Sequence, residues 1–448
     1  MPVVAGARPL LALNDTHAPE LRSWVPGAAP GSDFPIQNLP YGRYWSQRHH
    51  APRIGVAIGD AIVDLHEAAA AGALAGPGAD AVRGTASDDL RGLMASPRAD
   101  LQALRSGLSA ALAEGAARRA AMQLALLPRA GCQLLLPTAP PNYTDFFASI
   151  HHASNAGQIR RPGNPLLPNF HHLPVAYHGR PSTVRASGED VRRPRGQVLR
   201  EGAALPTLEA SQWLDFECEV ALWIGAPNEL GEPIGLDDAD AHLFGLGLLN
   251  DWSARDIQMW ETQPLGPFLS KNFLTTVSPW VVSADALIPF RVPAVARAQS
   301  TPPVLPYLCS ERNQRCGGID LRLAVELETA DMRRQGQAPV TLAAPRFKDH
   351  YWTPAQMIAH HTVNGCELLT GDLLGTGTVS GPAADELGCL LEMNRCGQQA
   401  LRLPNGETRM WLQDGDRITL RGRCEREGFV SIGFGEATGL VVANKALA

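Results

Sequence analysis

Short runs of alternating apolar and polar residues dominate the second half of the chain. The clearest lie at 213–225, 318–330 and 416–442, and Gly or Pro interrupts the chain repeatedly between them. Alternation with a period of two is typical of strands that bury one face. We therefore expect a mainly β, mostly antiparallel structure here, with one helix near 353–365.

The first third of the chain has a different pattern. Residues 53–64 alternate around a Gly-Asp pair, which predicts a hairpin, whereas 66–126 is rich in Ala, Leu and Arg with helical periodicity. The Pro-rich stretch 135–145 indicates a connector. We divide the chain into an N-terminal domain with a helical insert, 1–138, and a larger C-terminal domain, 139–448.

Composition and charge narrow the class of protein. The 448 residues are 45% hydrophobic and carry a net charge of −6, a poor match to a nucleic-acid binder. No apolar run approaches the roughly 18 residues that a membrane helix needs, and no signal peptide is evident. The eight cysteines are scattered singly. We expect reduced thiols in a cytoplasmic protein that makes no contact with membranes.

Three acids alternate in the segment "LDFECEVALW". As a strand, it places Asp215, Glu217 and Glu219 on one face. Neighbours on such a face are about 7 Å apart, so two carboxylates can converge on one cation. Three like charges without an interleaved Lys or Arg repel one another, which a bound metal ion would relieve. A polar face turned to solvent is the alternative.

The segment "NYTDFFASIHHASN" contains Asp145 and the pair His151 and His152. A spacing close to two helical turns could place Asp145 and His152 on one helix face. The alternative is that Asp145 caps a helix and that the histidines lie on the surface.

The segment "LLNDWSARDIQMWE" passes directly from an apolar run to charged residues. If it is helical, Asp251, Arg255 and Gln258 share one stripe, and Trp252 and Trp260 argue against full exposure. An ordinary surface ion pair, worth below about 1 kcal/mol, is the alternative.

Two further charges stand in apolar surroundings. Lys271 lies in a Gly/Pro-rich loop ahead of Thr275, and Glu392 follows a Gly/Ser-rich turn. Such a lysine either extends to solvent or binds an anionic oxygen, and the glutamate is either a buried partner of a histidine or a charge at a strand end. Together with the acids, these are the parts of a hard-cation site with a water-activating base.

Several of these stretches resemble the fumarylacetoacetate hydrolase family, in order and over most of the chain. The most specific are "NDWSARDIQ" and "GPFLSKNFLTTVSPW", and "SDFPIQNLPYG", "YTDFFASIHHASN" and "HHTVNGCELLTGDLLGTGTVSGP" also match. The resemblance implies an SH3-like β-barrel followed by a β-roll catalytic domain that forms a homodimer. It also implies hydrolysis of a β-diketo acid, 4-fumarylacetoacetate, to fumarate and acetoacetate, the last step of tyrosine and phenylalanine degradation.

The resemblance also implies roles for individual residues. It implies Mg²⁺ and/or Ca²⁺, a general base oriented by an acid, oxyanion-stabilising groups and substrate-binding groups. Four carboxylates exceed what Mg²⁺ usually takes from protein, which favours Ca²⁺. The matching residues are Asp145, Glu217, Glu219 and Asp251 for the metal, with Lys271 and Thr275 close to it; His152 and Glu392 for base and acid; Arg255, Gln258 and Lys271 for the oxyanion; and Arg161, Tyr177, Thr378, Arg255 and Gln258 for the substrate.

One departure from the family and two alternatives matter. Phe147 stands where the family usually has a tyrosine, which removes a hydroxyl and with it a hydrogen bond to substrate. Related enzymes use the same metal frame for acylpyruvate hydrolysis, oxaloacetate decarboxylation or hydration of dienoates. A non-catalytic, metal-stabilised β-protein is the alternative from another class, but it would not need a base, an acid and several donors.

Overall fold

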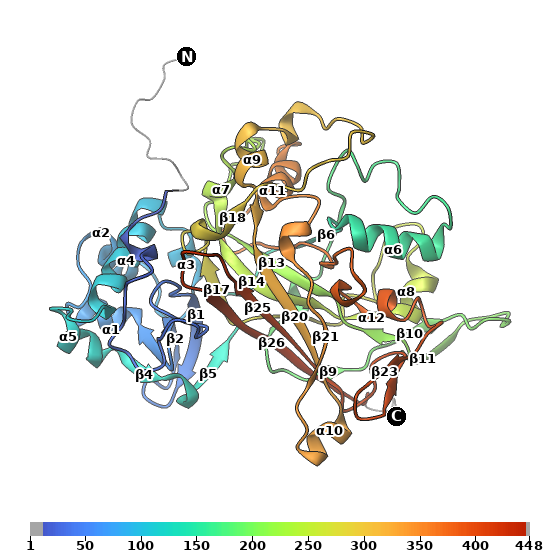
Figure 1. Cartoon of the computed structure of the whole chain (residues 1–448), viewed down its shortest axis with the longest axis horizontal. Helices are drawn as coiled ribbons and strands as arrows, with labels where there is room; N and C mark the ends of the chain where they lie inside the picture. The colour runs from blue at the N-terminus through green and yellow to red at the C-terminus, as the bar shows by residue number, and fades with distance from the viewer. Residues whose placement is uncertain (1–11, 445–448) are drawn as a thin grey trace.

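The computed structural model describes residues 12–444 and shows two units that share one sheet (Figure 1). Helix accounts for about 25% of the chain and strand for about 27%. The architecture is therefore sheet-rich but mixed, with more helix than the mainly β class we predicted. No helix within 12–444 combines the length and apolarity needed to cross a bilayer. All eight cysteines are free thiols, as expected.

The N-terminal unit has one antiparallel sheet in the order β4-β3-β2-β1-β5. The predicted hairpin at 53–64 is confirmed as β2 and β3, and its turn needs Gly59, which has φ +52 and no room for a Cβ beside the Pro26 carbonyl. The strands are β1 (Tyr41–Ser46), β2 (Pro52–Ile58), β3 (Ala61–Asp64), β4 (Leu126–Pro128) and β5 (Cys132–Leu135).

The predicted helical segment 66–126 is confirmed, but as five helices rather than one. Left-handed glycines at Gly72 and Gly115 and a proline at Pro97 separate them. They pack beside the N-terminal sheet, and α3 and the start of α4 also contact the larger unit, where Arg98 bonds to Asp240 and Asp285 (Figure 1). The helices are α1 (Leu65–Ala70), α2 (Gly76–Arg83), α3 (Arg91–Met94), α4 (Arg98–Leu112) and α5 (Arg119–Leu124).

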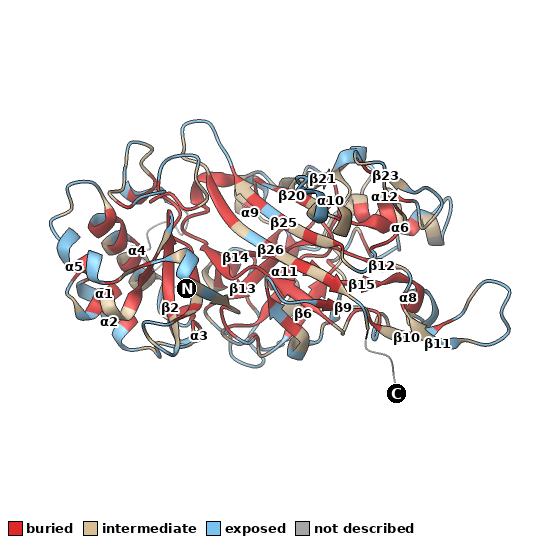
Figure 2. Cartoon of the chain, turned by 90° about the horizontal axis from the view of Figure 1, so that it is seen from below, coloured by how far each residue is buried: buried red, intermediate tan, exposed pale blue. Residues whose placement is uncertain are grey.

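The N-terminal sheet continues into the central sheet of the larger unit through the pairing of β1 with β17. From there the order is β17-β14-β13-β22-β6-β7, with β16 on β14 and β8 on β16. Every residue of β13 and β14 is buried, which explains their long apolar runs (Figure 2). These strands are β6 (Tyr143–Phe146), β7 (Ala176–His178), β8 (Val184–Ala186), β13 (Cys218–Ile224), β14 (Leu243–Asp251), β16 (Thr275–Val277), β17 (Trp280–Ser283) and β22 (Leu373–Gly375).

A second sheet covers the central one, in the order β21-β20-β25-β26-β9. Strand β20 alternates buried and accessible residues, and the buried ones join the same core as Val220 and Leu248. The strands predicted at 318–330 and 416–442 are thus confirmed. The five are β9 (Val191–Arg192), β20 (Leu321–Glu328), β21 (Val340–Ala343), β25 (Arg417–Cys424) and β26 (Ile432–Val442).

Short helices and hairpins surround these sheets. The helix expected at 353–365 is confirmed as α11, which begins with a Thr353–Gln356 capping box. The helices are α6 (Ile150–Arg160), α7 (Ala239–His242), α8 (Arg255–Glu261), α9 (Glu311–Cys316), α10 (Ala330–Gln335), α11 (Pro354–Thr362) and α12 (Leu390–Met393). The remaining strands are β10 (Arg195–Val198), β11 (Thr207–Ala210), β12 (Leu214–Asp215), β15 (Ser253–Ala254), β18 (Arg291–Val292), β19 (Gly318–Ile319), β23 (Leu401–Arg402) and β24 (Thr408–Arg409).

Candidate active site

Four buried carboxylates meet where the strands of the central sheet converge. Asp145 lies on β6, Glu217 directly before β13, Glu219 near the start of β13, and Asp251 at the end of β14. One oxygen of each lies within 4.8 Å of the others, and all four residues are at most 5% exposed. The structure therefore brings together the four acids that the family resemblance implies as metal ligands.

A glycine makes room for this cluster. Strand β22 lies between β6 and β13, and its Gly375 pairs with Asp145. A Cβ on Gly375 would lie 2.5 Å from Asp145 Oδ1 and 3.0 Å from Glu219 Oε2. Only glycine leaves space for both carboxylates at this position.

Lysine and two hydroxyl groups satisfy one side of the cluster. Lys271 Nζ donates to Glu217 Oε2 at 2.6 Å and to Asp251 Oδ2 at 2.8 Å. Thr275 Oγ1 donates to Asp251 Oδ1 at 3.0 Å, and the Tyr177 hydroxyl to Asp251 Oδ2 at 2.8 Å. Lys271 and Thr275, which were expected close to the metal, thus touch the acids, and so does Tyr177, which was expected to bind substrate.

The other side of the cluster lacks positive charge. Asp145 Oδ1 and Glu219 Oε1 are buried and have no hydrogen-bond partner among the described residues. Burial, together with the neighbouring carboxylates, raises the pKa of Asp145 and of Glu219 well above their ordinary values. Burial alone would also raise the pKa of Glu217, but Lys271 and Arg255 outweigh it and hold that pKa below its ordinary value.

These features fit a divalent metal ion. The donors are carboxylate oxygens alone, which suits a hard cation such as Ca²⁺ or Mg²⁺. Two of the oxygens have no other partner among the described residues. A cation would satisfy them and would also remove the repulsion that raises the pKa of Asp145 and Glu219.

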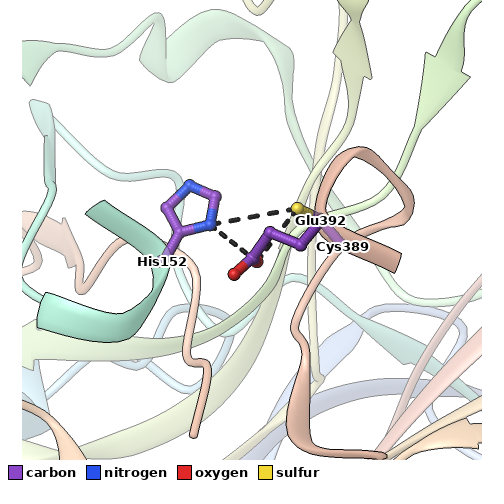
Figure 3. A group of neighbouring side chains, drawn as sticks. All are labelled: His152, Cys389 and Glu392. Atoms are coloured by element: carbon purple, nitrogen blue, oxygen red, sulfur yellow. Dashed lines mark hydrogen bonds and ion pairs between the residues drawn. The ribbon is translucent and has the colours of Figure 1, made fainter. Parts of the chain in front are cut away.

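A histidine and a glutamate form a buried pair close to this cluster. His152 Nδ1 lies 2.7 Å from Glu392 Oε2, with His152 on α6 and Glu392 on α12 (Figure 3). Because an ionised carboxylate only accepts hydrogen bonds, Nδ1 carries the proton, and the other ring nitrogen can act as a base. His152 also helps lower the pKa of Glu217, which places the pair within electrostatic range of the acids.

Three more donors hold Glu392 as an anion. Asn155 Nδ2 donates to Oε1 at 2.8 Å, Ser380 Oγ to Oε2 at 2.8 Å, and the Cys389 thiol lies 3.2 Å from Oε2 (Figure 3). Burial favours the neutral acid, yet His152 and these hydrogen bonds outweigh it, and the pKa of Glu392 lies below its ordinary value. His152, Cys389 and Glu392 could in principle ligate a metal. Because hydrogen bonds already occupy the carboxylate, we interpret them as a base with its orienting acid.

Arg255 lies against the carboxylate cluster. Its Nη1 lies 2.7 Å from Glu217 Oε1 and 3.1 Å from Gln258 Oε1, and its Nε lies 2.8 Å from Asp215 Oδ2. The side chain is fully enclosed, and Nη2 has no partner among the described residues. The Nη2 amino group of this guanidinium therefore has hydrogen-bonding capacity that no described residue uses.

Local secondary structure differs from the sequence prediction at several of these residues. Asp145 lies on a strand, so it neither shares a helix face with His152 nor caps α6, whose cap is Ser149. Asp251 ends β14 whereas Arg255 begins α8, so these two residues and Gln258 do not form one helical stripe. Pairing of β6 with the distant strand β22 overrides the local helical spacing.

The predicted strand at 213–225 is also interrupted. It divides into β12 and β13, with Phe216 and Glu217 between them, so alternation does not carry across. Asp215 consequently points to Arg255 and the start of α12 instead of joining Glu217 and Glu219. Glu392 lies on a short helix and is not a charge at a strand end.

Two predicted substrate-binding residues lie apart from the hydrogen bonds described so far. Arg161 is exposed at the end of α6, and its guanidinium donates to the Pro165 carbonyl at 2.8 Å. Thr378 is buried, and its hydroxyl has no partner among the described residues. Their roles remain predictions.

Sequence reasoning missed some residues that complete the site. Asn155 follows His152 by one helical turn, so its spacing could have indicated it. Ser380, Cys389 and Gly375 are far from their partners in sequence, and no local signal marks them. A cavity of about 170 Å³ borders one of the four acids, Asp251, and is lined among others by Tyr143, Tyr177, Phe268, Lys271 and Thr275.

Comparisons with known proteins agree over nearly the whole chain. Residues 142–442 match the sequence model of the fumarylacetoacetate hydrolase C-terminal domain, and residues 37–137 match that of the fumarylacetoacetase N-terminal domain. Fumarylacetoacetase of Bos taurus is 44% identical over 94% of this chain and 98% of its own length. That of Oryza sativa subsp. japonica is 45% identical over 94% and 97%. Among solved structures, fumarylacetoacetate hydrolase from Exiguobacterium antarcticum has a TM-score of 0.48 and 17% identity, covering 91% of this chain and 100% of that one.

Proposed function

Because this chain belongs to the fumarylacetoacetate hydrolase family, we propose that it hydrolyses the carbon–carbon bond of 4-fumarylacetoacetate. The products are fumarate and acetoacetate, and the reaction is the last step of tyrosine and phenylalanine degradation. The observation that carries the proposal is the His152–Glu392 pair, at 2.7 Å, beside the buried carboxylate cluster. A base next to a hard-cation site is what a water-dependent cleavage of a diketone requires.

His152 takes the proton from the attacking water. Its Nδ1 is held by Glu392, which leaves the other ring nitrogen to accept that proton and stabilises the imidazolium that forms. The resulting hydroxide adds to the carbonyl carbon of the fumaroyl group, which becomes a carboxyl group of fumarate. The carbon–carbon bond then breaks, fumarate forms, and acetoacetate leaves as an enolate that regains a proton.

Arg255, Gln258 and Lys271 stabilise the negative charge that develops on oxygen. Arg255 Nη2, which has no partner within residues 12–444, supports this role, as does the position of Lys271 on the wall of the cavity. These side chains are already fixed by Glu217 and Asp251, so little reorganisation accompanies the reaction.

Asp145, Glu217, Glu219 and Asp251 would hold the metal ion, with Lys271 and Thr275 beside it. A divalent cation there would supply Lewis-acid stabilisation of the diketone oxygens and of the enolate. A set of four carboxylates favours Ca²⁺, whereas Mg²⁺ normally keeps more water ligands.

Tyr177, Thr378 and Arg161 bind the acidic ends of the substrate. Tyr177 is supported by its place on the cavity wall, and Thr378 by its buried hydroxyl, which has no partner among the described residues. Arg161 would have to leave the Pro165 carbonyl to reach a carboxylate. Phe147 packs edge-on against His152, with ring centres 5.2 Å apart, and offers no hydrogen bond to substrate.

We also propose the finer domain architecture. Residues 1–138 form an SH3-like barrel domain with a helical insert, and 139–448 form the catalytic β-roll; residues 1–11 and 445–448 lie outside the described part of the chain. The five-stranded antiparallel N-terminal sheet supports the first assignment.

The enzyme acts as a cytoplasmic homodimer. Exposed apolar side chains on α8 and the loop that follows it support an interface; they are Met259, Trp260, Leu265, Phe268 and Leu269. Eight unpaired cysteines support a reducing compartment.

The test is the loss of ultraviolet absorbance of fumarylacetoacetate with purified protein, run with and without a chelator and with His152→Ala. Metal-dependent loss that disappears in the variant is expected. If the folded, metal-loaded wild-type protein leaves fumarylacetoacetate unchanged while it cleaves an acylpyruvate, the proposed substrate is wrong.

A further inference from the structure

Asp215 occupies a position between the two halves of the site. It is fully buried and touches neither the carboxylate cluster nor the cavity wall. Its Oδ2 accepts from Arg255 Nε at 2.8 Å and from the Leu391 amide at 3.0 Å. Its Oδ1 accepts from the Leu390 amide at 2.7 Å and from the Phe216 amide at 2.8 Å.

The contacts of Asp215 lead to both groups that perform the chemistry. In one direction lies the Arg255 guanidinium, which also contacts Glu217. In the other lie the first two residues of α12, which carries Glu392 and, through it, holds His152. This one carboxylate therefore joins the group that stabilises charge on oxygen to the group that orients the base.

We propose that Asp215 is a positioning residue that fixes Arg255 and the His152–Glu392 pair relative to each other. This inference rests on the proposed function for its kinetic consequence. Such fixing matters because both groups must address the same substrate carbonyl, and a displacement of about 1 Å at a reacting centre can cost about 100-fold in rate.

The partners of Asp215 make its charge and shape necessary. Four donors and no acceptor surround the carboxylate, which matches its lone pairs. A carboxamide of the same size presents two N–H groups, and in either orientation they face donors. Asp215→Asn therefore breaks the hydrogen bonds either with Arg255 and the Leu391 amide or with the Leu390 and Phe216 amides.

The N-terminal unit offers a matched control. Asp64 is also fully buried, accepts from Arg53 Nε at 2.8 Å, and accepts from the Glu67 amide at the start of α1 at 2.8 Å. Helix α1, which Asp64 caps, lies at the opposite end of the molecule from α12 (Figure 1). Asp64→Asn thus also removes a buried negative charge that accepts from an arginine and from an amide at a helix start, but it does so outside the candidate active site.

The experiment compares Asp215→Asn, Asp215→Glu and Asp64→Asn in the full-length, metal-loaded enzyme. The first readout is kcat and KM for fumarylacetoacetate. The second is the downfield proton resonance of the His152 Nδ1–H that Glu392 accepts, assigned by its absence from His152→Ala. We expect Asp215→Asn to lower kcat about 100-fold with KM within about threefold, and to broaden or shift that resonance. Asp64→Asn should leave both unchanged.

The outcomes separate this proposal from the proposed function. Unchanged kcat and an unchanged resonance in folded Asp215→Asn would overturn the positioning role. If the wild-type protein does not hydrolyse fumarylacetoacetate, the proposed function fails, whereas the resonance still decides the role of Asp215. Asp215→Glu keeps the charge and the acceptors but displaces them, so we expect an intermediate kcat, about 10-fold below wild type. Wild-type kcat in Asp215→Glu would overturn the proposal even if Asp215→Asn does not fold.

Discussion

Replacement of Glu392 by glutamine tests the buried pair most directly. The carboxylate accepts from His152, Ser380 and Asn155, all at 2.7–2.8 Å, and is held as an anion in a buried position. The glutamine side chain has nearly the same volume, and the Asn155 amide can turn to present its oxygen to the new N–H group. We therefore expect Glu392→Gln to fold and to lose chiefly the charge behind His152.

The expected loss of kcat follows from the strength of the hydrogen bond between His152 and residue 392, which the substitution weakens. A hydrogen bond to a charged group contributes about 1.5–3 kcal/mol, and the imidazolium that forms during the reaction depends on it most. At about 1.4 kcal/mol for each factor of ten, kcat should fall about 10- to 150-fold. KM should stay within about threefold, because Glu392 acts through His152 and not on the substrate.

The assay is steady-state loss of fumarylacetoacetate absorbance, with Glu311→Gln, an exposed helix residue, as control. The decisive comparison is the double variant. In a His152→Ala background, Glu392→Gln should have almost no further effect, because the two residues act as one unit. Full additivity, or wild-type kcat in Glu392→Gln alone, would refute the base-and-acid assignment.

Three further predictions concern the metal and the substrate. Because the pKa values of Asp145 and Glu219 are raised on folding, their contribution to stability is present at low pH and is lost as pH rises. The chelated protein should therefore have a lower Tm at about pH 8 than at about pH 5. Added Ca²⁺ should raise Tm more at about pH 8 than at about pH 5, measured by calorimetry. An equal increment at both pH values would contradict this. Gly375→Ala should push the carboxylates of Asp145 and Glu219 apart and weaken Ca²⁺ binding about 10- to 100-fold, as measured by titration calorimetry. Gly107→Ala is the control, because Gly107 has room for a Cβ and its substitution should leave Ca²⁺ binding unchanged. Phe147→Tyr should lower KM by up to about tenfold through one added hydrogen bond; an unchanged KM would mean that the hydroxyl does not reach the substrate.

The sequence predicted which side chains form the site better than it predicted the elements that hold them. The family resemblance identifies Asp145 and Asp251 as candidate ligands, and their chemistry agrees, since carboxylates in apolar surroundings need a partner. Their backbone conformations depend on pairing with strands far along the chain, such as β22 with β6, which helical spacing cannot reveal. The strand break at Phe216 is likewise a tertiary effect, and it is the reason that Asp215 was assigned to the wrong group of acids.

The pairing of β1 with β17 has a consequence for how the protein unfolds. Because one sheet runs through both units, the N-terminal unit cannot separate without baring the edge of β17. A bare edge strand of this kind is a site for intermolecular pairing and aggregation. We therefore expect a single cooperative unfolding transition for the two units, and an aggregation-prone product when proteolysis removes the N-terminal unit.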